Sequence, residues 1–331
     1  MTREIVVNGR FLSRRITGVE RHGREILSLF NGSCRVERTR MNGPAGHAWE
    51  QFLLPRKLKP ETVLWSPANS GPIWTQKQAV TIHDLSPLEH SEWFDADFAA
   101  WYRLFLPLLV KRAQVIFTPS HHVKQKMINR FNASNVIVIP NGVDTVRFHP
   151  DAIQNTYELP EKFILFVGTL QPRKNFQILL SAWDKIKDKF KDHWLIVVGD
   201  IGRVFAKTSF VTTECVRFLG YVREKDLPGI YAKARAFILP SFDEGFGLPA
   251  LEAMACGIPV IVSDGGALPE TVGDAGLIFK ATDVNDLTGS IEECLSDNGV
   301  RTSLVTRGFE RAKQFTWQKS AETVWKALNE I

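Results

Sequence analysis

The feature that most constrains the fold of this chain is a regular alternation of short apolar runs with amphipathic stretches. Continuous apolar runs separated by helical segments such as 18–30 and 95–112 indicate parallel strands that are covered on both faces. The pattern predicts an α/β fold with two doubly wound, Rossmann-like domains. The expected strands are 5–7, 63–65, 79–82, 115–118 and 136–139, followed by 163–167, 194–198, 216–219, 236–239 and 259–262.

Chain length and one polar segment place the domain boundary. A chain of 331 residues suits two domains, and the segment 140–160 is rich in Pro, Asn, Gly and Asp, as a linker would be. We expect an N-terminal domain over 1–145 and a second domain over 146–310. The stretch from about 302 to 330 is expected to be helix, and residues 311–331 are expected to form a C-terminal helix that packs back on the N-terminal domain.

Composition and cysteine spacing exclude several classes of protein. The 44% of apolar and 23% of charged residues are typical of a globular protein in water, and no apolar run is long enough to span a bilayer. The four cysteines lie far apart, so neither a disulfide framework nor a metal cluster is expected. We therefore expect a cytoplasmic location, where cysteines stay reduced. Asp-x-Asp occurs only at Asp95–Asp97, within a helical stretch, and no metal is assigned to it.

The most informative loop is 241–257, which reads Ser-Phe-Asp-Glu-Gly-Phe-Gly-Leu-Pro-Ala-Leu-Glu-Ala-Met-Ala-Cys-Gly. Ligands of such sheets bind beyond the carboxyl ends of the strands, and this loop follows a predicted strand. Gly245 and Gly247 allow the backbone to approach a ligand closely. Leu248 begins a predicted helix with Pro249 in its first turn, and a helix N-terminus is suited to bind a diphosphate.

Two carboxylates, Glu244 and Glu252, lie within this loop and helix with seven residues between them. Together with Gly245, Phe246 and Gly247, they resemble the Glu-x7-Glu signature of the retaining glycosyltransferases of family 4, which share the GT-B fold. The resemblance implies two Rossmann-like domains whose parallel sheets face a central cleft. It also implies that Glu244 and the amides of residues 245–247 hold the transferred sugar, and that Glu252 holds the ribose of the nucleotide.

A second loop, 168–175, resembles another motif of that family. It carries Gly168 and the adjacent cations Arg173 and Lys174 after a predicted strand. Two adjacent cations match a diphosphate, because charge-assisted hydrogen bonds contribute roughly 1.5–3 kcal/mol each. We expect both side chains to lie on a solvent-facing loop and to stabilise the departing phosphate.

Weaker motifs complete the expected donor and acceptor sides. Gly199, Tyr221 and Val222 follow strands and suit close approach of a nucleotide base. In the N-terminal half, Gly18 resembles the family's glycine loop near the donor phosphates. His83 ends a strand and resembles the family's cleft histidine, which faces the reacting sugar.

The resemblance implies transfer of a sugar from a nucleoside-diphosphate sugar to an acceptor hydroxyl, with the anomeric configuration retained. It extends to bacterial polysaccharide and O-antigen enzymes, so the expected acceptor is a glycan or a lipid-linked glycan. GDP-mannose is the favoured donor, with UDP-sugars next, and no metal or other cofactor is expected.

Three other classes of protein could also contain alternating strands and helices. A nicotinamide dehydrogenase needs Gly-x-Gly-x-x-Gly after its first strand, and residues 8–13 lack it. A sugar-nucleotide epimerase can share the predicted architecture. A non-catalytic nucleotide-sugar binder would carry the same donor motifs.

Charge suggests one further partner. Residues 1–60 hold 12 Lys and Arg against 5 Asp and Glu, a local net charge of +7. No zinc-finger or RNA-binding motif accompanies them, so nucleic acid is not expected. The stretch 101–112 mixes apolar and basic residues, and Pro107 is expected to interrupt its helix. Either the protein docks weakly on the anionic inner face of the cytoplasmic membrane, or this stretch packs as an interior helix.

Overall fold

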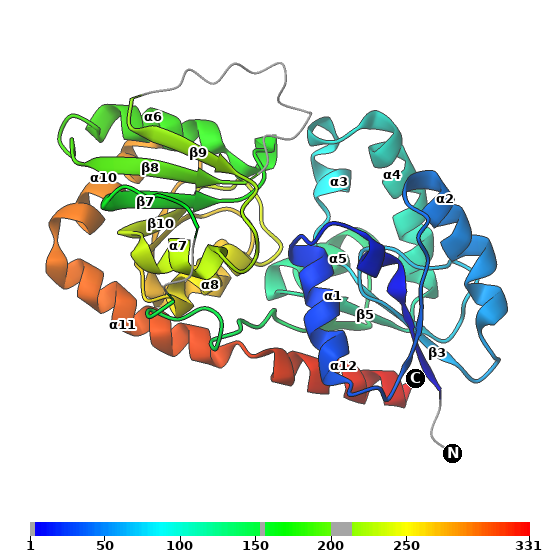
Figure 1. Cartoon of the computed structure of the whole chain (residues 1–331). Helices are drawn as coiled ribbons and strands as arrows, with labels where there is room; N and C mark the ends of the chain where they lie inside the picture. The colour runs from blue at the N-terminus through cyan, green and yellow to red at the C-terminus, as the bar shows by residue number, and fades with distance from the viewer. Residues whose placement is uncertain (1–3, 153–155, 200–213) are drawn as a thin grey trace. The chain divides into compact units, whose positions relative to one another are not determined.

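The computed structural model describes residues 4–152, 156–199 and 214–331, and the chain divides into two compact units. One unit comprises Met1–Gly142 and Thr316–Ile331, and the other comprises Val143–Phe315. Each unit contains a six-stranded sheet with helices on both of its faces (Figure 1). All strand pairs are parallel, so the predicted fold of two doubly wound domains is confirmed.

The sheet of the N-terminal unit has the strand order β2-β1-β3-β4-β5-β6. Its strands are β1 (Ile5–Asn8), β2 (Arg35–Glu37), β3 (Val63–Ser66), β4 (Gln78–Thr81), β5 (Val115–Thr118) and β6 (Val136–Val138). The short strand β2 was missed because two of its three residues are charged. The chain leaves β1 toward β2 on one side and then returns to β3 on the other. The carboxyl ends of β1 and β3 are therefore the topological switch point of this sheet.

Helices cover both faces of the N-terminal sheet. They are α1 (Gly18–Leu29), α2 (Gly43–Ala48), α3 (Ser86–Glu89), α4 (Ala96–Arg112), α5 (His121–Phe131) and α12 (Trp317–Glu330), with shorter turns at Gly9–Ser13, Trp49–Leu53, Pro55–Lys57 and Ser91–Trp93. Residues of α4 and α5 pack with β4 and β5 in one apolar core. Helix α1 packs against α12, where the rings of Phe30 and Trp325 lie 5.0 Å apart.

The sheet of the C-terminal unit has the order β12-β11-β10-β7-β8-β9, so its switch point lies between β7 and β10. Its strands are β7 (Lys162–Val167), β8 (His193–Val198), β9 (Val216–Gly220), β10 (Ala236–Leu239), β11 (Val260–Ser263) and β12 (Gly276–Phe279). Its helices are α6 (Phe176–Ile186), α7 (Leu227–Lys233), α8 (Leu248–Ala255), α9 (Leu268–Val272), α10 (Val284–Ser296) and α11 (Asn298–Gln314), with turns at Pro172–Lys174 and Gly273–Ala275.

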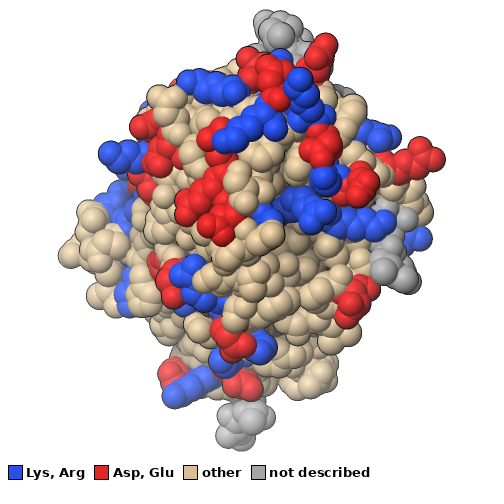
Figure 2. Space-filling view, turned by 90° about the vertical axis from the view of Figure 1, so that its left-hand side faces the viewer, with Lys and Arg blue, Asp and Glu red and all other residues tan. Residues whose placement is uncertain are grey.

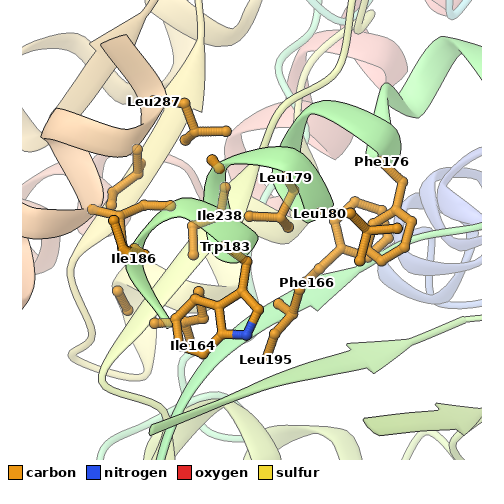
Figure 3. Close-up of a cluster of buried hydrophobic side chains, with 14 of the residues drawn as sticks. Ile164, Phe166, Phe176, Leu179, Leu180, Trp183, Ile186, Leu195, Ile238 and Leu287 are labelled. Carbon is orange, nitrogen blue, oxygen red and sulfur yellow. The ribbon is translucent and has the colours of Figure 1, made fainter. Parts of the chain in front are cut away.

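The core on one face of this sheet explains why α6 forms where it does. Alternate residues of β7, β8 and β10 point to that face, and Trp183 of α6 packs among them with Ile164 and Leu195 (Figure 3). Leu287 of α10 joins the same cluster. The apolar residues of α6 recur at helical spacing and therefore lie on one face of the helix. Burial of this face against the sheet holds in place the strand ends that carry the loops described below.

Two helix predictions were wrong in detail. The stretch 302–330 is not one helix, because α11 ends at Gln314 and α12 begins at Trp317. Phe315 has an extended backbone there, and Thr316 caps α12 by accepting a hydrogen bond from the Lys319 amide. Pro107 does not interrupt α4, which continues through it over 17 residues.

Candidate functional site

The loops that follow β7, β8 and β9 are tied together by glycine backbones. Gly168 N donates to Val198 O at 2.9 Å, and Gly199 N donates to Gly220 O at 2.8 Å. Gly199 has φ +145°, and a Cβ there would lie 1.8 Å from Gly168 O. Position 199 therefore requires glycine for packing between two loops, whatever its role toward a nucleotide.

Two further donor-side candidates follow this glycine pair. Tyr221 is exposed and Val222 is buried, directly after β9. The neighbouring Asp200 lies outside the described residues.

The switch point between β7 and β10 brings two cations onto one carboxylate. Lys174 donates through Nζ to Glu244 Oε1, and Arg173 Nη1 donates to Oε2 at 3.0 Å. Arg173 Nη1 also donates to the carbonyl of Asp243 at 2.9 Å. The structure thus places Glu244 against two adjacent cations that lie 70 and 71 positions before it in the sequence.

Ser241 was missed by the sequence reasoning and belongs to the same cluster. Its hydroxyl donates to Glu244 Oε1 at 2.7 Å, and its side chain is fully buried. Ser241 lies two residues beyond Leu239, the last residue of β10, and this place just after a strand was the signal that could have marked it.

The expectation of a solvent-facing cation pair was wrong for Lys174, which is buried beside Glu244. Its aliphatic part lies over Gly168, where a Cβ would meet Lys174 Cε at 3.6 Å. Burial by itself would raise the pKa of Glu244, but the charges of Lys174 and Arg173 outweigh it and hold the pKa at about 2. Glu244 is therefore ionised at neutral pH, and the three side chains carry a net charge of +1.

Helix α8 begins three residues beyond this cluster. Gly247 precedes it with φ +97°, and a Cβ there would lie 2.5 Å from a side-chain carbon of Leu268, so only glycine fits. Phe246 and Leu248 are buried on either side of it, and Gly245 precedes Phe246 in the turn.

Glu252, on the second turn of α8, is also buried. Tyr231 of α7 donates its hydroxyl to Glu252 Oε2 at 3.1 Å. The sequence reasoning missed Tyr231, since nothing in the sequence indicates that α7 packs on α8. Both glutamates of the Glu-x7-Glu pattern are thus buried polar groups with defined partners, unlike surface carboxylates.

In the N-terminal unit, His83 lies just beyond β4 and is fixed by the loop after β3. Its amide donates to Asn69 Oδ1 at 2.6 Å, and its Nε2 lies 2.8 Å from the carbonyl of Pro67. A carbonyl only accepts, so Nε2 carries the proton and Nδ1 is left as the acceptor.

His22 packs edge-on against His83, with ring centroids 4.7 Å apart. Burial lowers the pKa of His83, and burial together with the neighbouring His83 lowers that of His22 to about 3. Both rings are therefore neutral at physiological pH, and Nδ1 of His83 is a hydrogen-bond acceptor.

Other predicted positions in this unit serve helix ends. Gly18 is the first residue of α1, and a Cβ there would meet nothing within 4 Å, so the backbone is open to a ligand. Asp95 caps α4 by accepting from the amides of Asp97 and Phe98 at 3.1 and 3.3 Å. Over the described residues, the structure contains no group of three or more His, Cys, Asp or Glu side chains that could hold a metal.

Comparison with known proteins gives matches over most of the chain. A family model described as glycosyl transferases group 1 matches residues 151–311, and one described as glycosyltransferase family 4 matches residues 56–147. The O-antigen chain mannosyltransferase B of Escherichia coli is 32% identical over 311 residues, which cover 90% of this chain and 80% of that protein. The serotype-specific mannosyltransferase WbdA of Escherichia coli is 28% identical over 77% of this chain, which spans 33% of that longer protein.

A solved structure has the same fold. The Anabaena protein Alr3699/HepE in complex with UDP-glucose superposes with a TM-score of 0.76, covers 100% of both chains and is 18% identical. At that identity the likeness concerns the fold, and both doubly wound units take part in it.

Proposed function

The chain belongs to glycosyltransferase family 4, and we propose that it moves mannose from GDP-mannose to a hydroxyl of a bacterial surface glycan. The donor proposal is supported by the names of its relatives, which include O-antigen chain mannosyltransferases. UDP-sugars are the second choice of donor. The acceptor would be a polysaccharide or the glycan of a lipopolysaccharide precursor.

The observation that carries this proposal is the buried cluster of Lys174, Arg173 and Glu244. Buried charges are costly unless a function or a partner keeps them there. The cluster lies at the switch point of its sheet, where ligands of doubly wound domains bind. Glu244 balances only one of the two cations, and the remaining charge of +1 next to the N-terminus of α8 favours a negatively charged diphosphate.

These groups suit departure of a nucleoside diphosphate. The bond between the anomeric carbon and the phosphate oxygen breaks, and Arg173 and Lys174 take up the negative charge that develops on that oxygen. We propose that they do so without a metal ion, since two fixed cations supply the charge that a metal would otherwise bring.

We further propose that the anomeric configuration is retained. Both oxygens of Glu244 are engaged by cations, which makes this carboxylate a poor nucleophile. A displacement on the same face of the sugar needs no nucleophile from the protein. The acceptor oxygen bonds to the anomeric carbon as the phosphate leaves, and the acceptor proton passes to an oxygen of the leaving phosphate.

The remaining residues would bind and orient the donor. Glu252 would accept hydrogen bonds from the ribose hydroxyls, with Tyr231 holding one of its two oxygens in place. Glu244 would accept from a hydroxyl of the transferred sugar, and neutral His83 would accept from another. Gly18, where a Cβ would meet nothing within 4 Å, would leave room for a phosphate beside the backbone. The amides of residues 245–247 would hold the transferred sugar with Glu244.

The proposed location is the cytoplasm, with weak docking on an anionic membrane. Helix α4 buries one face but exposes Phe98, Trp101, Leu104 and Leu108, of which Leu104 is 73% exposed. These residues recur at helical spacing, so they form one apolar stripe. The basic residues Arg103, Lys111 and Arg112 are also exposed on α4.

This stripe fits a bilayer interface better than plain water. Exposed apolar side chains beside Lys and Arg are typical of interfacial helices on acidic lipids. By contrast, acidic and basic side chains are interspersed on the face shown in Figure 2, which fits a solvated surface. No helix in the described part of the chain is long and apolar enough to cross a bilayer.

The function is tested by incubating the full chain with GDP-mannose and a panel of mannose-terminated oligosaccharides. The expected result is acceptor-dependent release of GDP, one molecule for each mannose added, with an α linkage to the product as in the donor. An altered sugar nucleotide without acceptor would indicate an epimerase. Donor binding without turnover across the panel would indicate a binder. Inversion at the anomeric carbon would contradict the proposed chemistry.

A further inference from the structure

The switch point of the N-terminal sheet holds a second polar site. A cavity of about 10 Å³ lies beyond β1 and β3, and Arg10, Arg14, Glu50, Ala68 and Ser70 are among its lining residues. That volume admits a single water-sized group. Doubly wound domains bind ligands at their switch points. In the C-terminal unit, the cluster of Arg173, Lys174 and Glu244 lies at the switch point between β7 and β10.

The cavity is lined by a buried, closely bonded set of polar groups. Arg10 Nη1 lies 2.9 Å from Glu50 Oε2, and both side chains are almost completely buried. Asn8 Nδ2 donates to Glu50 Oε1, and the Ser70 hydroxyl donates to the same oxygen at 3.1 Å. A buried ion pair is often no more stabilising than apolar residues of the same volume, so stability alone does not explain this set.

The same loop forms the wall of this cavity and the support of His83. Pro67 and Ala68 line the cavity. The carbonyl of Pro67 accepts from His83 Nε2, and Asn69 Oδ1 accepts from the His83 amide. The loop 67–69 therefore both lines the cavity and fixes the proposed sugar-binding histidine.

An aromatic surface lies on the other side of the ion pair. Arg10 Nη1 is 3.1 Å from His47 Nδ1, and the His47 ring is 5.3 Å from the partly exposed ring of Trp101. Sugar sites combine such flat apolar surfaces with a few fixed polar groups. Trp101 also belongs to the apolar stripe of α4, and His47 connects it to Arg10, which lines the cavity.

We propose that this cavity takes one hydroxyl of the terminal sugar of the acceptor glycan. A hydroxyl both donates and accepts, which matches a lining that offers guanidinium donors and a carboxylate acceptor side by side. An anion fits less well because Glu50 would face it. This inference rests on the proposed glycosyl transfer and adds the residues that select the acceptor.

The test fills the cavity without breaking the ion pair. Ala68→Leu adds three carbons to the cavity wall, and Ala45→Leu makes the same change on the exposed side of α2 as a control. Binding of methyl α-mannoside is followed by saturation-transfer NMR, and GDP binding by calorimetry. Where turnover is found, the KM for the acceptor is measured too. Ser70→Ala, which keeps the fold but removes one lining hydroxyl, is a second variant.

The expected result is binding of methyl α-mannoside by the wild type and Ala45→Leu, loss of that binding in Ala68→Leu, and weakening in Ser70→Ala. The KM for the acceptor should rise at least tenfold in Ala68→Leu, with unchanged GDP affinity. Equal binding by wild type and Ala68→Leu would overturn the proposal. So would absence of binding to a wild-type chain that still binds GDP. Failure to bind GDP at all would instead count against the proposed donor.

Discussion

Arg173 Nη1 lies 3.0 Å from Glu244 Oε2, so the cation proposed to receive the leaving phosphate is paired with the carboxylate proposed to hold the sugar. Lys174 pairs with the other oxygen of the same carboxylate. The charges of Lys174 and Arg173 keep Glu244 ionised. A bound diphosphate would share the two cations with Glu244, and this sharing makes the cluster sensitive to the charge of each member.

The first prediction concerns pH. The folded-state pKa of Glu244 is about 2, below its ordinary 4.5, so its ionised form stabilises the fold above about pH 4.5. This contribution is lost as the pH falls toward 2, and a shift of this size corresponds to the order of 3 kcal/mol. At pH 6 the free energy of unfolding of the wild type should therefore exceed that of Glu244→Gln. The difference between the two proteins should become smaller by pH 3. Urea denaturation of both proteins measures it, and a gap that does not change with pH would refute the assigned pairing.

The second prediction concerns Tyr231. Tyr231→Phe removes the hydroxyl that donates to Glu252 Oε2 and leaves the ring in place. A lost hydrogen bond to a charged group is worth about 1.5–3 kcal/mol, so the Kd for GDP should rise by about tenfold or more. We expect kcat to change little, because ribose binding is the same in the ground state and the transition state. Tyr157→Phe, outside the proposed site, is the control. Unchanged GDP affinity in Tyr231→Phe would argue that Glu252 does not bind the ribose.

A third prediction concerns metal ions. If Arg173 and Lys174 supply the positive charge, turnover should persist after treatment with EDTA. The assay compares rates before and after chelation, and after adding Mg²⁺ or Mn²⁺ back. Complete loss that Mn²⁺ restores would show that a metal takes part, and Asp97 and the capping residue Asp95 would then need to be tested.

Much of the fold could be predicted from the sequence because parallel strands buried on both faces leave an unbroken apolar signal. All ten predicted strands are present within a residue or so of their expected bounds. The edge strands β2 and β12 were missed, because Arg35 and Glu37 break the apolar run of β2, and β12 begins with Gly276 and is only four residues long. A short strand at the edge of a sheet has few buried residues, so its local sequence lacks the apolar pattern by which a central strand is recognised.

The candidate site could be predicted as motifs but not as contacts. Glu244, Arg173 and Lys174 stand out by type and by their place after a strand. They pair because β7 and β10 are neighbours in the sheet. The order of the strands in the sheet cannot be read from the motifs themselves. The Arg10–Glu50 pair went unnoticed for the same reason, since 40 residues separate its members and neither belongs to a recognisable motif.

The fourth prediction concerns membranes. The chain should sediment with anionic vesicles at low salt and detach at high salt, because Lys and Arg near an acidic surface contribute about 1 kcal/mol each. A double change, Leu104→Gln with Leu108→Gln, should weaken this binding. Ile278→Gln, which alters an exposed apolar side chain of the other unit, should not. Equal failure of the wild type to bind anionic or neutral vesicles would remove docking from the account.

The central claim is that Lys174 and Arg173 bind and stabilise the departing diphosphate, and one comparison tests it most directly. Calorimetric titration with GDP and turnover of GDP-mannose are measured for the wild type, Lys174→Ala, Arg173→Ala and the exposed control Lys185→Ala, with circular dichroism to confirm folding. The account predicts that each cluster variant folds, binds GDP more weakly and loses about 100-fold or more in kcat, while the control matches the wild type. Wild-type GDP affinity and turnover in both cluster variants would contradict it.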